Sequence, residues 1–312
     1  MKQLVFIGAL LLAVLPARAF PQDHDHAAMA AGQAMPAVHS MNNKDLPPDE
    51  AHAKERLSTS PRHGEWVRIT AGGADVNSWV VYPERRTKAP VVIVIQEIFG
   101  LTDWIRGVAD QLAAEGFIAI APDLLSGHGP SGGGTEAYPS RDDVTRAVSA
   151  LPREEVNLRL DAVRAYGLRL PASSSRSATV GFCWGGSSSF AYAVAQPGLD
   201  AAVVYYGTAP TDEGGAQGAF APAASLVRVN AAILGLYGGS DARIGATVPS
   251  TQQKMQELRK RYEAQSFEGA GHGFLRDQMG QDGANMKATD LAWPKTIAFL
   301  RKYAEGSSPS RP

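Results

Sequence analysis

The sequence predicts an α/β fold, with a mostly parallel central sheet and helices on both of its faces. Two observations carry this prediction. Continuous apolar runs, as at 89–95 and 117–121, are typical of parallel strands that are covered on both sides. Segments with apolar residues at helical spacing separate these runs, and strands that alternate with helices build parallel sheets through right-handed crossovers. In such a sheet, functional residues gather where the strands end.

The expected elements begin with a hairpin at 64–83, because two β-prone runs flank a Gly-Gly turn. A buried strand within 89–100 follows. The stretch 103–116 is expected to be a helix, since Asp103 stands near its start and Gly116 near its end. The remaining expected elements are a strand within 117–125, helices within 141–168, a strand at 178–181, a helix from 184, strands at 201–206 and 232–237, a helix at 250–262, a short strand at 265–267 and a terminal helix at 286–303.

The composition is that of an ordinary soluble globular protein, with 44% hydrophobic and 20% charged residues among 312. The formal net charge is −1, so the chain has no basic field that could hold a nucleic acid or an anionic membrane surface. We therefore expect no nucleic acid partner. We also expect a monomer.

Residues 1–19 have the pattern of a secretory signal peptide. Lys2 precedes an apolar run at 4–15, and Ala17 and Ala19 have the spacing that signal peptidase recognises. Cleavage after Ala19 would leave a periplasmic or secreted protein. The apolar run is too short to span a bilayer, so no membrane association is expected after cleavage.

We expect residues 20–61 to form a disordered tail, because they are rich in histidine, methionine and proline and have no sustained apolar period. Imidazole and thioether groups suit copper, so metal capture is an alternative role. Their spacing matches no defined site, and no metal or cofactor is predicted. These side chains are His24, His26, His39, Met29, Met35 and Met41. The catalytic domain is expected at 62–305, followed by a disordered C-terminus at 306–312.

Cys183 is the single cysteine, so no internal disulfide can form. It follows a β-prone run and stands between Gly181 and Gly185 in the pattern G-x-nucleophile-x-G, which is typical of a nucleophile at a strained strand-to-helix turn. The N-terminus of the following helix would stabilise a thiolate. The alternative is a small buried side chain in a tight turn.

Three further polar residues follow predicted strands: Glu97, Asp241 and His272. Taken alone, Asp241 in "YGGSDARI" is typical of a turn former, and His272 in "GAGHGFLR" is typical of a solvated loop residue. Together with Cys183 they give the order nucleophile, acid, histidine, which is the chain order of α/β-hydrolases. Glu97 in "IQEIFG" could accept the cysteine proton or hold the thiol at rest.

The combination of QEIFG, PDLL, GFCWGG, the loop with Asp241 and HGFLR resembles the dienelactone hydrolase family over about residues 65–303. The resemblance implies the α/β-hydrolase fold. It also implies hydrolysis of enol-lactones such as carboxymethylenebutenolide, through a cysteine-histidine-aspartate triad.

Residue roles follow from the same resemblance. Cys183 resembles the family's nucleophile, His272 its general base and acid, and Asp241 the residue that orients the imidazole. Glu97 resembles the glutamate that pairs with the cysteine in the resting enzyme. The backbone amides expected to form the oxyanion hole are those of Ile98 and Trp184.

The sequence departs from the family pattern at one substrate-binding position. The prototype enzymes bind a substrate carboxylate with two arginines, one shortly after the PDL motif and one after the histidine. Arg276 matches the second, whereas Gly127 stands at the first with His128 beside it. His128 either supplies part of the missing charge or is a solvated loop residue. An imidazole with an unperturbed pKa near 6.5 is mostly neutral at pH 7.

We therefore expect a hydrolase that cleaves an enol-lactone through a covalent thioester intermediate on Cys183. A thiolate is easily expelled from a tetrahedral intermediate, which favours substrates with a good leaving group such as an enolate. Two alternatives stay open: a periplasmic hydrolase of other activated esters or thioesters, and a non-catalytic metal-binding periplasmic protein.

Overall fold

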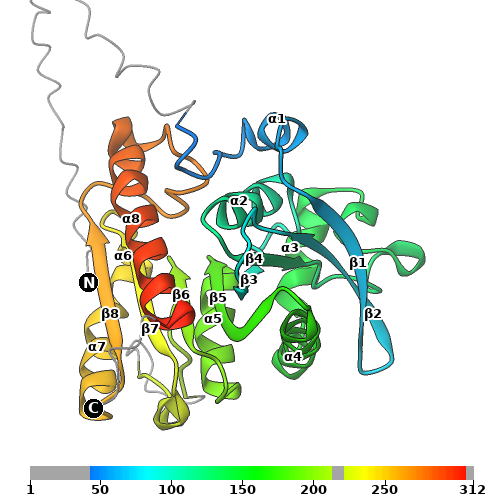
Figure 1. Cartoon of the computed structure of the whole chain (residues 1–312). Coiled ribbons are helices and arrows are strands. Elements are labelled where there is room, and N and C mark those ends of the chain that lie inside the picture. The colour runs from blue at the N-terminus through cyan, green and yellow to red at the C-terminus, as the bar shows by residue number, and fades with distance from the viewer. Residues whose placement is uncertain (1–42, 213–220, 307–312) are drawn as a thin grey trace, which may run out of the picture. The chain divides into compact units, whose positions relative to one another are not determined.

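The computed structural model describes residues 43–212 and 221–306. Within these ranges an eight-stranded sheet has the order β1-β2-β4-β3-β5-β6-β7-β8 (Figure 1). The strands are β1 (Gly64–Ala71), β2 (Ala74–Val81), β3 (Ala89–Ile95), β4 (Ile118–Pro122), β5 (Ser173–Phe182), β6 (Ala201–Tyr205), β7 (Ala232–Gly238) and β8 (Tyr262–Phe267). β2 pairs antiparallel with β1 and β4, and every other pair is parallel. The predicted mostly parallel sheet is confirmed.

The helices in the described ranges are α1 (Ala53–Ser58), α2 (Asp103–Ala114), α3 (Arg141–Ala150), α4 (Arg153–Arg169), α5 (Trp184–Ala195), α6 (Ala242–Gly245), α7 (Val248–Glu257) and α8 (Ala284–Leu300). Helices α2 to α7 lie in connections between strands, whereas α1 precedes β1 and α8 follows β8. Short 3-10 turns lie at Pro130–Gly132, Thr135–Ala137, Ala224–Arg228 and Gln281–Gly283, and a π turn at Arg301–Glu305 ends the described chain. None of the helices in the described ranges is both long and apolar enough to cross a bilayer.

The predicted hairpin is present, because its Gly-Gly turn has the required backbone. Gly72 and Gly73 have φ of 60° and 91°, which two-residue hairpin turns need and glycine adopts without strain. The helix predicted at 250–262 is shorter than expected. It ends at Glu257, and Arg259 turns the chain with a φ of 54° into β8. The polar start of β8 carries no apolar run that would have marked it as a strand.

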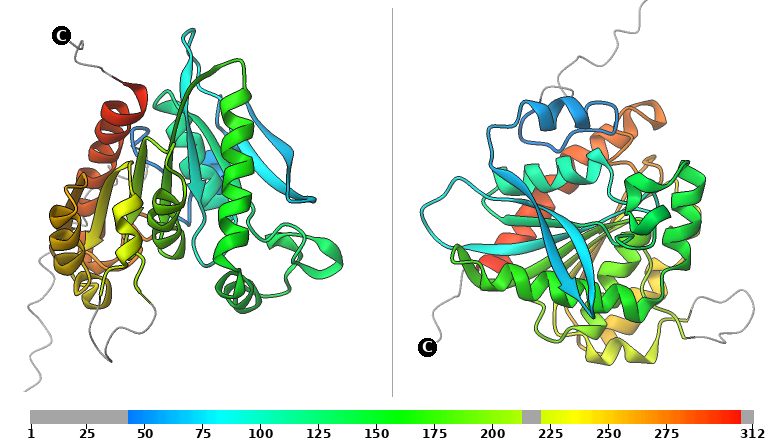
Figure 2. Two further views of the ribbon diagram at one scale, coloured as in Figure 1. Left: turned by 90° about the horizontal axis from the view of Figure 1, so that it is seen from below. Right: turned by 90° about the vertical axis from the view of Figure 1, so that its right-hand side faces the viewer.

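The two faces of the sheet bury alternate side chains of each strand. In β3, Val92 and Val94 pack in the same buried cluster as residues of α2 and α8. Val91, Ile93 and Ile95 pack in the cluster that includes residues of α4, α5 and α7. Helices therefore cover both faces, as Figure 2 shows. Each buried valine or isoleucine contributes about 1.5–3 kcal/mol, so this alternation holds the parallel strands in place.

The prediction that the folded domain begins at 62 is wrong. Leu46 and Ala53 are buried in the same cluster as α2. The indole Nε1 of Trp104 donates to the carbonyl oxygen of Pro48 at 3.0 Å, and Nε2 of Gln278 donates to that of Pro47 at 3.0 Å. Residues 43–61 therefore belong to the folded domain.

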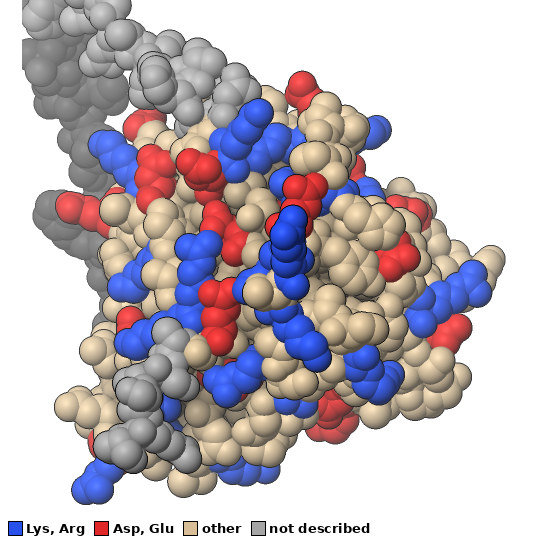
Figure 3. Space-filling model, viewed as in Figure 1, with Lys and Arg blue, Asp and Glu red and all other residues tan. Residues whose placement is uncertain are grey.

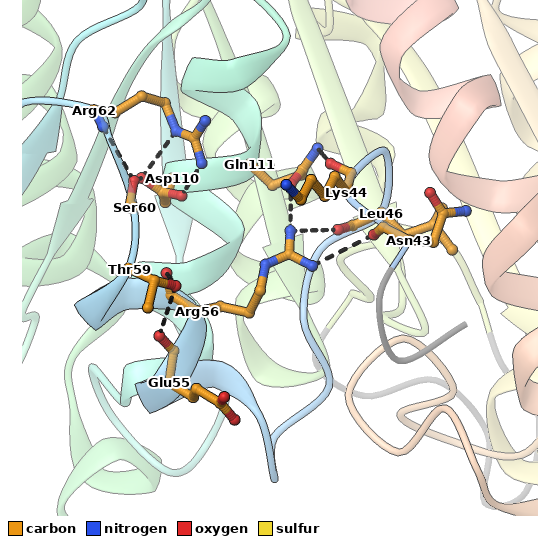
Figure 4. A network of polar contacts seen from close by, with 10 residues as sticks. All are labelled: Asn43, Lys44, Leu46, Glu55, Arg56, Thr59, Ser60, Arg62, Asp110 and Gln111. Carbon is orange, nitrogen blue, oxygen red and sulfur yellow. Dashed lines mark hydrogen bonds and ion pairs between the residues drawn. The ribbon is translucent and has the colours of Figure 1, made fainter. Parts of the chain in front are cut away.

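Polar contacts hold this segment, which is why apolar periodicity did not reveal it. The guanidinium of Arg56 donates to the carbonyl oxygen of Leu46 at 3.2 Å and to Oε1 of Gln111 at 3.1 Å (Figure 4). Nε2 of Gln111 donates in turn to the carbonyl oxygen of Lys44 at 3.0 Å. The predicted signal peptide, the six histidine and methionine candidates for metal capture and residues 307–312 lie outside the described residues.

Charged side chains of both signs are interleaved on the face shown in Figure 3. This mixture accords with the formal net charge of −1. No broad single-sign surface is therefore seen on this face among the described residues.

Candidate active site

Cys183 occupies a strained turn between β5 and α5. Its backbone has φ 55° and ψ −115°, a conformation that costs a non-glycine residue about 1–3 kcal/mol. A Cβ added to Gly181 would lie 2.0 Å from the carbonyl oxygen of Gly185, and one added to Gly185 would lie 2.2 Å from that of Gln96. The two glycines therefore allow three backbone segments to meet at the cysteine, as the motif predicts.

Asp241 and His272 form a hydrogen-bonded pair beside this turn. Asp241 follows β7 and caps α6, and its side chain is 9% exposed. Its Oδ2 lies 2.5 Å from Nδ1 of His272, which follows β8. The carboxylate thereby favours a proton on Nδ1 and leaves Nε2 as the free nitrogen of the ring. A paired imidazole of this kind can accept a proton at Nε2 while the aspartate stabilises the resulting cation.

Glu97 is a buried carboxyl just beyond β3, with 3% of the residue exposed. Its Oε2 lies 2.9 Å from Nε of Arg276. Burial raises the pKa of Glu97 to about 7, although the charge of Arg276 opposes this shift. The carboxyl therefore changes its protonation state near neutral pH.

Two effects favour the protonated form of the Cys183 thiol. Burial, and then the negative charge of Glu97, raise its pKa above the ordinary value. The backbone N–H of Trp184 and the guanidinium groups of Arg243 and Arg276 act in the opposite direction but do not cancel the shift. Because the thiolate is the reactive form, the site needs a base that takes this proton.

Tyr206 is a site residue that the sequence analysis missed. It follows β6 with a φ of 40°, is fully buried, and its ring centroid lies 5.0 Å from that of His272. Its hydroxyl makes no hydrogen bond with the described residues. Burial, followed by the charges of Glu97 and Cys183, raises its pKa. A tyrosine directly after a buried strand was the available signal, but many core tyrosines share it.

Arg276 contacts two acids. Besides Glu97 it pairs with Glu50, which lies in the N-terminal segment and also pairs with Arg141. The guanidinium carbon of Arg141 lies 3.7 Å from the ring centroid of Phe99. Neither Glu50 nor Arg141 was predicted from the sequence as a site residue, because both lie far from any motif.

His128 lies in a different environment. Its Nε2 lies 2.6 Å from Oε1 of Glu155 in α4, and that carboxylate also pairs with Arg159 at 2.7 Å. Among the described residues, Glu155 is the only side chain that hydrogen-bonds the imidazole of His128. The structure therefore does not bring His128 to Arg276, and its suggested role in substrate binding stays a prediction.

Ile98 follows β3, and Trp184 directly follows Cys183 as the first residue of α5. Their side chains pack on one small cluster, formed by Leu125, Val144 and Val148. A hollow of about 720 Å³ borders Trp184 between α4 and α5. Its lining includes none of Cys183, Asp241, His272 and Glu97. Elsewhere in the described ranges, no group of three or more histidine, cysteine, aspartate or glutamate residues is arranged to hold a metal ion.

A parallel sheet that carries a cysteine, an aspartate and a histidine after its strands in this chain order defines the α/β-hydrolase class. The family model described as "Dienelactone hydrolase family" matches residues 76–304. The chain belongs to the dienelactone hydrolase family, and the predicted fold and family are both confirmed.

Individual relatives cover most of the chain. A protein of Yersinia pestis named "Putative carboxymethylenebutenolidase" is 31% identical over 268 residues, 83% of this chain and 97% of the relative. A protein of the same name from Salmonella typhimurium is 31% identical over 237 residues, 75% of this chain and 86% of the relative. The crystal structure of a "Putative Dienelactone Hydrolase" from Klebsiella pneumoniae has a TM-score of 0.66 at 29% identity, covering 78% of this chain and 99% of that one.

Proposed function

We propose that this protein hydrolyses enol-lactones or similarly activated esters through a covalent thioester on Cys183. The observation that carries this proposal is the convergence of Cys183, the Asp241–His272 pair and Glu97. They follow β5, β7, β8 and β3, respectively. Because these strands run parallel, all four residues lie at the carboxyl ends of the strands. The names of the relatives support a lactone or ester as the class of substrate.

The first half of the reaction forms the thioester. The proton of the Cys183 thiol passes to Nε2 of His272, and the sulfur bonds to the carbonyl carbon of the substrate. The backbone N–H groups of Ile98 and Trp184 hold the oxyanion. The carbon–oxygen bond of the ester then breaks, and the imidazolium returns its proton to the leaving enolate oxygen. Asp241 stabilises the imidazolium in between.

The second half releases the acid. His272 takes a proton from water, and the resulting hydroxide oxygen bonds to the thioester carbon. The carbon–sulfur bond breaks as the oxyanion collapses. The thiolate of Cys183 regains a proton from the imidazolium, which restores the resting site.

Glu97 is a second group that can exchange a proton with the thiol. A carboxyl with a pKa of about 7 is populated in both forms at neutral pH, so it can accept a proton and return it. Its ionised form also disfavours a thiolate beside it. We propose that Glu97 keeps Cys183 protonated until a substrate is bound.

Replacement of the nucleophile tests this mechanism. Cys183→Ala should lower kcat by at least about 10⁴-fold on an enol-lactone, an aryl ester and a thioester, since removal of a nucleophile abolishes the covalent route. Intact-mass measurement of the wild type after brief mixing with a slow ester should reveal the acyl adduct, and Cys183→Ala should show none.

Glu55→Gln is a suitable control for purity and folding. Glu55 is exposed on α1, and its carboxylate makes no hydrogen bond or ion pair with the described residues, so this variant should match the wild type. Retained turnover in Cys183→Ala would contradict the thioester mechanism. Cleavage of the aryl ester with no cleavage of the enol-lactone would instead favour the other activated esters as substrates.

We also propose export of the protein. The signal-like pattern at 1–19 supports this, and those residues lie outside the described ranges. Expression of the full chain in a bacterium, followed by cell fractionation and N-terminal sequencing, should give a periplasmic protein that starts at Phe20. A cytoplasmic protein that keeps Met1 would refute the proposal.

A further inference from the structure

The carboxylate of Glu50 lies between two guanidinium groups. Its Oε1 is 3.0 Å from Nη2 of Arg141, and its Oε2 pairs with Nη1 of Arg276. Phe99 lies beneath both cations, with its ring centroid 3.7 Å from the guanidinium carbon of Arg141 and 5.3 Å from that of Arg276. The two arginines and the ring of Phe99 thus form a clamp that holds the carboxylate of Glu50.

The position of Glu50 is set by the backbone. Its N–H donates to the carbonyl oxygen of Arg276 at 3.0 Å, which ties the N-terminal segment to the loop after His272. On either side, Asp49 accepts the N–H of His52 at 2.9 Å, and Arg56 anchors the segment to α2 (Figure 4). A folded segment therefore holds the carboxylate of Glu50 in place at the clamp.

The clamp is joined to the catalytic centre through one side chain. Nε of Arg276 lies 2.9 Å from the buried carboxylate of Glu97, while Nη1 of Arg276 pairs with Glu50. The clamp is also open to solvent, since the side chains of Glu50 and Arg141 are 38% and 51% exposed. A hollow of about 480 Å³ lies between residues 49–52 and the loop 276–279. A ligand can therefore reach these guanidinium groups.

We propose that Glu50 is a specificity-determining residue, which occupies the site that Arg141 and Arg276 would otherwise offer to the carboxylate of a substrate. This inference rests on the proposed hydrolase function. The protein should therefore prefer esters and lactones whose acyl or leaving group carries no negative charge near this clamp.

Charge balance explains the preference. The two arginines face the two acids Glu50 and Glu97, so with both acids ionised the cluster has no surplus charge for an anionic ligand. A substrate carboxylate must displace Glu50, which is held at high local concentration because it belongs to the same folded chain. Two partly exposed ion pairs of this type correspond to a factor of about 5 to 30 in binding.

A matched pair of enol-lactones tests the proposal. One carries an exocyclic methylene group and the other an exocyclic carboxymethylene group, so they differ by one carboxylate. In Glu50→Gln, the ratio of kcat/KM for the anionic lactone to that for the neutral lactone should rise about 5- to 30-fold over the wild type, mainly through KM. Glutamine keeps the shape of the side chain and removes only its charge.

Three further variants isolate the cause. Glu50→Asp keeps the charge but shortens the reach to the two guanidinium groups, so the ratio should rise by a smaller factor. Glu50→Gln combined with Arg141→Gln should lose most of the gain, because one cation of the clamp is missing. Glu55→Gln, an exposed acid on α1, should leave both lactones unaffected. A ratio that changes less than twofold in both Glu50→Gln and Glu50→Asp would overturn the proposal.

A binding measurement separates this inference from the proposed function. If the wild type cleaves neither lactone, enol-lactones are not its substrates, and titration calorimetry with benzoate then tests the clamp alone. Glu50→Gln should bind benzoate about 5- to 30-fold more tightly than the wild type. Equal affinity in the two proteins would overturn the role of Glu50, whatever the protein hydrolyses.

Discussion

Glu97 should make the stability of this protein depend on pH in a way that Glu97→Gln removes. Burial raises the pKa of Glu97 from an ordinary value of 4.5 to about 7 in the folded protein. Below pH 4.5 the carboxyl is protonated in both the folded and the unfolded state, so it does not make the free energy of unfolding depend on pH. Between 4.5 and 7 the unfolded chain has released a proton that the folded protein still holds, so the free energy of unfolding falls as the pH rises.

The size of this loss follows from the two pKa values. They lie about 2.5 pH units apart, and each unit corresponds to 1.36 kcal/mol, so the wild type should lose about 3 kcal/mol by pH 8. Glutamine carries no charge at any pH and escapes this loss. The stability of Glu97→Gln relative to wild type should therefore increase by about 3 kcal/mol between pH 4.5 and pH 8.

Urea unfolding followed by circular dichroism, repeated across this pH range, measures the difference. Comparing the two proteins at each pH cancels the contributions of groups that they share. Glu55→Gln is the matched control, and its stability relative to the wild type should not change with pH in the same way. A constant difference between Glu97→Gln and the wild type would show that Arg276 keeps the carboxyl ionised throughout, and would refute the reasoning.

Two further predictions concern the turn and the triad. Gly185→Ala should destabilise the fold by about 1–3 kcal/mol and lower kcat, because its Cβ would lie 2.2 Å from the carbonyl oxygen of Gln96. Gly245→Ala, whose Cβ would meet nothing within 4 Å, is the control, and equal melting temperatures of the two variants would contradict the prediction. Asp241→Asn should lower kcat by about 10⁴-fold at pH 7 with little loss of stability, since the amide no longer holds the proton on Nδ1 of His272. Steady-state kinetics measure this, and a loss under tenfold would argue against the assigned role.

Local patterns predicted most of the architecture. The apolar run of β3 and the Gly-Gly turn of the first hairpin act over a few residues, so they are visible in the sequence. The motif around Cys183 predicted a turn whose glycines the structure explains, because the clash of an added Cβ is a short-range effect. The limits of α7 and β8 were less well predicted, since a polar edge strand has little local signal.

Residues 43–61 were misassigned for a different reason. Their composition predicted a tail, but Gln111 and Trp104 of α2 hold the segment through hydrogen bonds to the backbone carbonyl oxygens of Lys44 and Pro48. Every residue has a backbone carbonyl group, so the composition of a segment does not reveal which of these groups will accept a tertiary hydrogen bond.

The sequence by itself determined the order of the strands and helices along the chain, the tight turn at Cys183, and the family. These depend on backbone geometry and side-chain periodicity within short stretches. Only the tertiary structure decided which charges surround the site. Glu50 and Arg276 are 226 positions apart, and Glu50 and Arg141 are 91 apart. No local pattern links residues at such separations, and their contact arises when the N-terminal segment packs on the folded sheet and helices.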